Sequence, residues 1–67
     1  MRIHPTEAAA ILGTSPEFVR VAMQQGRLPI GTAVKTSSRW TYYISGKLLE
    51  EYSGVNVVEA IDRLRRK

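Results

Sequence analysis

Apolar residues recur at helical spacing over the first third of the chain, and a single glycine interrupts them. Ile11 and Leu12 close an alanine-rich run that is typical of a short helix, which Gly13 ends in the left-handed conformation that glycine tolerates. We expect this helix to begin at Thr6, a good N-cap residue, with Glu7 at the positive end of the helix dipole.

A second short helix follows almost at once. Ser15 is expected to cap it, and Pro16 occupies its first position, where the missing N–H costs nothing. Gly26 and Pro29 end it, and its apolar stripe consists of Phe18, Val19, Ala22 and Met23. Two helices joined so tightly must cross, as in the helix-turn-helix that places its second helix in the DNA major groove. An ordinary helical hairpin without a ligand is the alternative.

Residues 30–44 change to a period of two, which predicts a β-hairpin. The expected inward positions are Trp40, Tyr42 and Ile44 on the second strand and Ile30, Thr32 and Val34 on the first. The polar turn is residues 36–38, flanked by Lys35 and Arg39, so the hairpin resembles a wing that reaches phosphates or a neighbouring groove. The alternative is a soluble tip whose cations only prevent aggregation. Aromatics among cations also stack on single-stranded bases, but the alternation favours burial of Trp40 and Tyr42 and exposure of Tyr43.

Two further helices are expected after the hairpin. Ser45 caps a short helix over residues 46–52 that ends at Gly54, and Asn56 with Glu59 starts a last one. Their expected core positions are Leu48, Leu49, Tyr52, Val57, Val58, Ile61 and Leu64. The last helix ends in Arg63, Arg65, Arg66 and Lys67. These cations complement the helix dipole, contact phosphate, or lie on an exposed helix that pairs with another copy, and a frayed tail is a further alternative.

Composition narrows the function classes. A chain of 67 residues has one small core, and with 43% apolar and 24% charged residues it is expected to fold. It has no cysteine and one histidine, so we expect no disulfide, metal site, cofactor or enzymatic activity. No acidic residue lies between Glu17 and Glu50, and the net charge is +4, which favours nucleic acid or an anionic membrane surface as the partner. No apolar run is long enough to span a bilayer, and the start is not a signal peptide, so a soluble intracellular protein is expected.

The order of these elements resembles a known family. TEAAAILGTSPEFVRVAMQQGRLPIG, a basic hairpin ending in RWTYYI, and SGKLLEEY are similar to the MerR-like winged helix-turn-helix of phage and transposon excisionases over about residues 3–53. The matching positions are Ala8, Ala9, Leu12, Gly13, Ser15, Gly26, Leu28, Pro29, Arg39, Trp40 and Tyr52.

The resemblance implies a single domain, mainly α with a small β-hairpin: a winged helix-turn-helix over residues 1–54 and a basic amphipathic helix over 55–67 as its extension. It further implies a cytoplasmic bacterial protein, encoded by a phage or mobile element, that serves as a recombination accessory factor or a small transcriptional regulator. Such a protein works in several copies, bends DNA, or helps an integrase-type recombinase to assemble.

The expected contacts with double-stranded DNA fall into two groups. The first group lies on the helix-turn-helix and is expected to read base edges or to hold a phosphate at the start of the second helix. Its members are Thr14, Ser15, Glu17, Arg20, Gln24 and Gln25. The second group holds the backbone or enters the minor groove: Arg27, Lys35, Thr36, Ser37, Ser38, Arg39 and Lys47. Arg20 is the one basic residue of the second helix, and the glutamines supplement it because glutamine pairs with adenine. A protein–protein adaptor that uses the fold without DNA is the alternative function.

Overall fold

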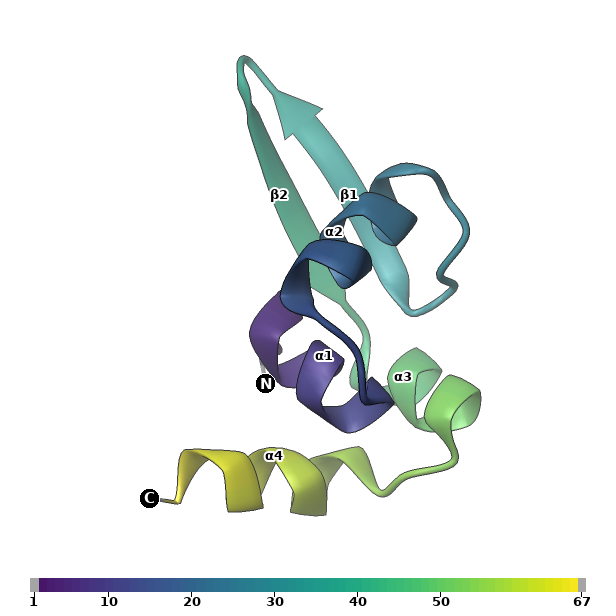
Figure 1. The fold of residues 1–67 in the computed structure, drawn as a ribbon, viewed down its shortest axis with the longest axis vertical. Coiled ribbons are helices and arrows are strands. Elements are labelled where there is room, and N and C mark those ends of the chain that lie inside the picture. The colour runs from purple at the N-terminus through teal and green to yellow at the C-terminus, as the bar shows by residue number, and fades with distance from the viewer. Residues whose placement is uncertain (1, 67) are drawn as a thin grey trace.

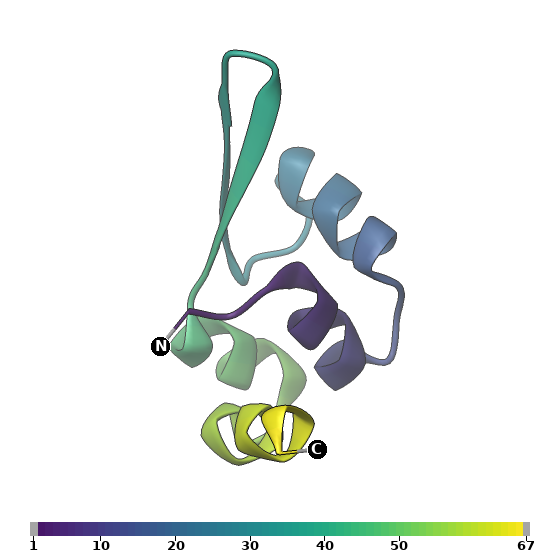
Figure 2. The same ribbon diagram turned by 90° about the vertical axis from the view of Figure 1, so that its left-hand side faces the viewer.

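The structure, a computed structural model, describes residues 2–66, and over this range it is mainly helical with one two-stranded antiparallel hairpin. Its elements are α1 (Pro5–Leu12), α2 (Pro16–Gln24), β1 (Gly31–Thr36), β2 (Arg39–Ile44), α3 (Gly46–Ser53) and α4 (Val57–Arg65). The hairpin projects from one end of the helical body, and α4 lies across the opposite end (Figures 1 and 2). The predicted basic residue Lys67 lies outside the described residues.

The helix ends follow the sequence signals with one exception. Helix α1 begins at Pro5 with His4 as its N-cap, so the prediction that Thr6 caps it is wrong. The reason is that Glu7 accepts a hydrogen bond from the His4 backbone N–H at 3.0 Å, which closes a capping interaction two residues earlier than expected. Gly13 takes the left-handed conformation (φ 73°) that was predicted for it.

The other caps are confirmed by their hydrogen bonds. The Ser15 hydroxyl accepts from the Phe18 backbone N–H at 3.1 Å, the Ser45 hydroxyl from Leu48 N–H at 3.2 Å, and the Asn56 side-chain oxygen from Glu59 N–H at 3.1 Å. Gly54, also in the left-handed conformation, ends α3 as predicted. Because these caps satisfy backbone N–H groups at the helix starts, short helices can follow one another through tight turns around a small core.

The core lies where the four helices meet the base of the hairpin. Its buried residues are Ile3, Ala8, Ala9, Val19, Ala22, Met23, Leu28, Ile30, Ile44, Leu49, Val57 and Ile61. Ala8 and Ala9 are almost completely buried, and their small side chains let α2 approach α1 closely. Ile11 and Leu12 pack against this cluster but are only partly buried.

Several predicted core residues are exposed instead. They are Phe18 on α2, Leu48 and Tyr52 on α3, and Val58 on α4, with Leu64 at the margin of exposure. Successive residues on a helix point about 100° apart, so Phe18 and Val58 leave the narrow buried stripe that their neighbours Val19 and Val57 occupy. The apolar stripe of each helix is therefore wider than the part of the helix that this small core buries.

The hairpin register differs from the predicted one on β1. Ala33 lies opposite Tyr42 and Lys35 opposite Trp40, so the face shared with the apolar side of β2 carries Ala33 rather than Thr32 and Val34, which are exposed. Ile30 is buried as predicted, but it precedes the strand, where its carbonyl accepts from the Ser45 N–H. In a strand, a shift of one residue exchanges the two faces.

The hairpin also buries less of its aromatic side than expected. Ile44 is buried at its base, Tyr42 is half-buried, and Trp40 is 38% exposed, so the prediction of a core position for Trp40 is wrong. The cause is geometric, because the hairpin extends beyond the helices that cover its base (Figure 1). Tyr43 is exposed, as its opposite phase predicts.

Helix α4 is packed onto the body rather than frayed. Val57 and Ile61 are buried, and α4 contacts both α1 and α3. Glu50 on α3 accepts from the Val57 backbone N–H at 3.2 Å, which ties the start of α4 to the preceding helix. None of the helices in residues 2–66 combines the length and apolar content needed to cross a bilayer.

Candidate nucleic-acid interface

The outward face of α2 is free of neighbouring elements over much of its length. Val19, Ala22 and Met23 face the core, whereas Glu17 and Arg20 are exposed on the other side of the helix. This is the arrangement expected of a helix that presents one face to a ligand and packs with the other.

Gln24 and Gln25 point in different directions, although the sequence places them side by side. The Gln24 amide nitrogen donates to the Tyr42 hydroxyl at 2.6 Å, which links the hairpin side of α2 to β2. This bond uses one amide N–H and leaves the second N–H and the carbonyl oxygen for another partner. Gln25 instead lines a groove with Phe18 and Tyr52 on the far side of α2, away from Gln24.

The turn before α2 is committed to backbone structure. Thr14 is half-buried, and its N–H donates to the carbonyl of Ala9. The Ser15 hydroxyl oxygen accepts from Phe18 N–H, but its own O–H remains available as a donor. Ser15 is exposed, whereas Thr14 is half-buried and so less accessible than a predicted contact residue would be.

The predicted residues of the hairpin tip lie together at the end of the molecule farthest from α4 (Figure 1). Residues 35–39 are all exposed, and the turn consists of Ser37 and Ser38 because Thr36 pairs with Arg39. Arg27 and Lys47 are exposed but belong to other parts of the surface: Arg27 lies on the loop after α2 beside the Phe18 groove, and Lys47 on the first turn of α3.

The arginines of α4 are neutralised by acids of the same molecule. Arg63 pairs with Glu59 at 3.4 Å, Arg66 pairs with Asp62, and Arg65 binds both carboxylate oxygens of Glu7 at 2.6 and 2.9 Å. Within residues 2–66, no ion pair is formed by the remaining cations, which are Arg2, Arg20, Arg27, Lys35, Arg39 and Lys47. None of these unpaired cations lies on α4 itself.

The Glu7–Arg65 pair was not predicted from the sequence. The two residues are 58 positions apart, and no local pattern joins them. The hydrogen bond from Arg65 lowers the pKa of Glu7 from its usual 4.5 to about 2, against the raising effect of burial and with help from the His4 backbone N–H. Glu7 in turn raises the pKa of Arg65. Both groups are therefore fully charged at neutral pH.

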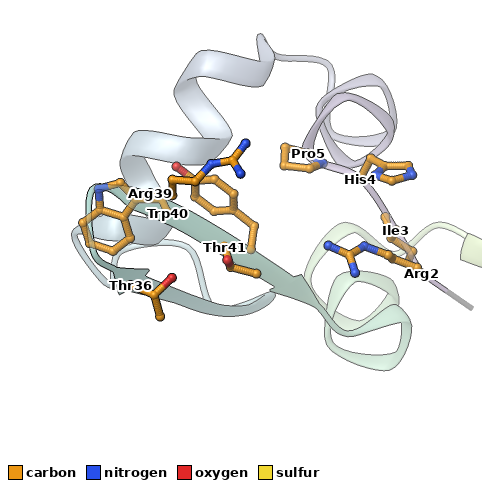
Figure 3. A pocket seen from close by; sticks show the side chains of 9 residues that line it. Arg2, Ile3, His4, Pro5, Thr36, Arg39, Trp40 and Thr41 are labelled. Atoms are coloured by element: carbon orange, nitrogen blue, oxygen red, sulfur yellow. The ribbon is translucent and has the colours of Figure 1, made fainter.

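A groove of about 360 Å³ lies between the N-terminal segment and β2, and sequence reasoning missed it. Arg2, His4 and Pro5 line one side, and Arg39 and Trp40 belong to the other (Figure 3). Arg2 precedes the buried residue Ile3 in a segment that has no repeating apolar pattern. The sequence therefore gives no sign that Arg2 lies near the hairpin.

A second groove, of about 280 Å³, is more apolar. Phe18 (54% exposed) and Val21 on α2 line it with Tyr52 (53% exposed) on α3 and Leu28 on the following loop. The groove thus brings exposed aromatic side chains from two different helices to one place on the surface. Among the described residues, no cluster of three potential metal ligands exists.

Comparison of the chain with protein-family models, with curated proteins and with solved structures finds no match.

Proposed function

We propose that this protein binds double-stranded DNA as a winged helix-turn-helix, with α2 in the major groove and the β1–β2 hairpin as the wing. The observation that carries the proposal is the division of charge. The arginines of α4 are paired within the molecule, whereas Arg20 on α2 and Lys35 and Arg39 on the hairpin have no ion-pair partner within residues 2–66. Such a surface attracts a polyanion, since each phosphate that it neutralises releases a condensed counterion.

The shape of this surface favours duplex DNA over an unstructured polyanion. The DNA major groove is about 12 Å wide and admits one α-helix. Helix α2 projects an exposed face beside a hairpin whose tip extends beyond the helical body (Figure 2), so both could contact adjoining parts of one duplex.

Within the major groove, Arg20 is the residue that best fits base reading. Its exposed guanidinium is suited to the two acceptors of guanine, and Gln24 retains one N–H and its carbonyl oxygen for adenine. Because the Tyr42 hydroxyl fixes the Gln24 amide, less side-chain entropy is lost on binding than for a free glutamine. The wing residues 35–39 supply phosphate contacts, which position the protein without reading sequence.

The biological role that we propose is regulatory or accessory to recombination, as the resemblance to excisionases implies. Footprinting on the DNA that flanks its own gene separates the two. Phased repeated sites with bending support an architectural role in excision, and one palindromic operator supports a repressor dimer.

The base-reading role is tested by comparing two variants that each remove one arginine. Arg20→Ala should weaken binding to the footprinted site by roughly 1–3 kcal/mol and relax one base position. Arg66→Ala, whose charge is already paired with Asp62, should leave that affinity nearly unchanged. If Arg20→Ala weakened binding equally on the specific site and on random duplexes, the base-reading role would be wrong.

A protein–protein adaptor is the second candidate, and the apolar groove at Phe18 and Tyr52 is the observation that favours it. In that case the exposed aromatics contact a partner, and no salt-sensitive binding to duplex DNA occurs. Phe18→Ser should then abolish capture of that partner, whereas Arg20→Ala should leave it unchanged.

A further inference from the structure

The groove between the N-terminal segment and the hairpin brings two arginines together that are far apart in the sequence. Arg2 lies beside Ile3 and ahead of α1, and Arg39 opens β2. Figure 3 shows the two side chains on opposite sides of the groove, Arg2 on the N-terminal segment and Arg39 on the hairpin. Like charges that face each other across a gap favour an anion between them.

The remaining lining of the groove is rich in hydrogen-bond donors. The other lining residues include Thr36, Thr41, Trp40 and His4, whose side chains carry hydroxyl or ring N–H groups, and none of the residues that line the groove is acidic. Tyr42 also lines the groove, and its hydroxyl, which accepts from Gln24, keeps its own proton. A group that accepts several hydrogen bonds and carries negative charge matches this lining.

The charge of the acid nearest in sequence to this segment is already compensated. Glu7 is held by Arg65 through both carboxylate oxygens, and one of these oxygens also accepts from the His4 N–H. Its side chain is only 13% exposed. Glu7 therefore does little to repel an anion at Arg2.

Arg65 also fixes the backbone that carries Arg2. Its guanidinium donates to the Arg2 carbonyl while it binds Glu7, and the buried side chain of Ile3 anchors the next residue. One residue of the last helix thus positions the N-terminal segment against the body. Arg65 is a positioning residue for the groove and does not line it.

We infer that this groove holds a backbone phosphate of the DNA strand that passes along the hairpin, between the Arg2 and Arg39 guanidinium groups. The inference rests on the proposed function and adds an N-terminal contact to it. Arginine is well suited to such a site, because its planar fork of donors matches phosphate oxygens. A free phosphate or a mononucleotide offers the same chemistry, and the experiment separates these sources.

Trp40 supplies the readout, because it is the chain's single tryptophan and it lines the groove. We expect its fluorescence to change when duplex DNA is added and to remain unchanged with inorganic phosphate or ATP at the same phosphate concentration. An equal response to ATP or phosphate would overturn the assignment to DNA and indicate a site for a free anion. A response to an acidic peptide such as polyglutamate but not to duplex would also overturn it.

The arginine variants test the contact itself. By counterion release, loss of one phosphate contact weakens binding about eightfold at 0.1 M salt and lowers the salt slope by about one unit. We expect this result for Arg2→Ala. We expect it also for Arg65→Ala, although Arg65 does not touch the phosphate, because Arg65 positions the backbone that carries Arg2. Circular dichroism confirms that each variant is folded. Arg2→Lys should restore most of the salt slope.

Arg66→Ala is the matched control, because it removes the same charge from a paired, exposed site. If duplex binds but Arg2→Ala behaves like Arg66→Ala, the groove inference fails and the proposed function stands. If no duplex binds even to the unaltered protein, both fail. If Arg65→Ala is folded and binds like the unaltered protein, its positioning role is wrong.

Discussion

The Glu7–Arg65 pair makes a specific prediction about stability and pH. Glu7→Gln removes the charge that Arg65 binds but retains a carbonyl oxygen that accepts from the His4 N–H, so the cap of α1 is preserved. The substitution therefore isolates the ion pair that joins the last helix to the first.

Its magnitude follows from the geometry. The fall in the pKa of Glu7 from 4.5 to about 2 corresponds to roughly 3 kcal/mol of preference for the charged form. Because the Arg65 side chain is 45% exposed, water screens the pair, and we expect the contribution to the free energy of unfolding to be about 1–2 kcal/mol. For a domain of this size, that loss lowers Tm by roughly 4–16 °C.

The sign of the pH dependence is fixed by the lowered pKa. The stabilisation is fully present above pH 4.5, where the carboxylate is charged in both the folded and unfolded states, and it is lost as the pH falls from 4.5 through 2. The difference between the unaltered protein and Glu7→Gln should therefore be largest near pH 7 and shrink toward zero near pH 2.

Chemical denaturation monitored by circular dichroism at several pH values measures this difference. Asp62→Asn is the control, since its pair with Arg66 is exposed on both sides and is expected to contribute less than about 0.5 kcal/mol. Equal losses for the two variants, or a Glu7→Gln difference that stays constant from pH 7 to pH 2, would refute the reasoning.

Three further predictions concern the hairpin and the core, each measured by chemical denaturation. Gly31→Ala should destabilise by more than about 2 kcal/mol and distort the hairpin register seen by NMR, because a Cβ there would lie 1.9 Å from the Tyr43 carbonyl oxygen; an unperturbed stability would mean that the strands are farther apart. Ser37→Gly should stabilise by up to about 1 kcal/mol, because Ser37 holds a φ of 57° that glycine adopts freely; a loss would show that the Ser37 side chain makes a compensating contact. Leu49→Ala should cost about 2–5 kcal/mol and Leu48→Ala less than about 1 kcal/mol, since the first is buried and the second is 42% exposed; similar costs would contradict the packing of α3.

Local signals in the sequence predicted most of the secondary structure. Ser15, Ser45 and Asn56 cap the helices that were expected to follow them, Gly13 ends α1 in the predicted conformation, and α3 ends at Gly54 as expected. These signals succeed because a cap depends on residues three positions apart, and no distant part of the chain is needed to form it.

Burial was predicted less well because it depends on how much surface so small a body can cover. Trp40 and Tyr52 follow the apolar pattern of their elements, yet both are exposed. Trp40 lies on the part of the hairpin that extends past the helices, and Tyr52 lies at the side of α3 that faces the groove with Phe18. A periodic pattern indicates a side of an element but not how far the neighbouring element reaches.

The candidate site shows the same division between local and distant relations. The exposure of Arg20 and of the hairpin tip was predicted from spacing, and the structure places them on free surface. The bond from Gln24 to Tyr42 and the groove that Arg2 and Arg39 both line involve residues that are distant in sequence, so the sequence pattern contained no sign of them. The pairing of Arg65 with Glu7 likewise joins the basic end of α4 to α1, a role that the helix dipole does not predict.

The salt dependence of binding to duplex DNA tests the central claim most directly. Fluorescence anisotropy with a labelled duplex from the flanking region, measured between about 50 and 200 mM salt, gives the slope of log affinity against log salt. About six phosphate contacts would give a slope near −5. Lys35→Ala with Arg39→Ala should reduce its magnitude by about two units, whereas Arg63→Ala with Arg66→Ala should not. Absence of binding, or a slope near zero that none of these substitutions changes, would contradict the account.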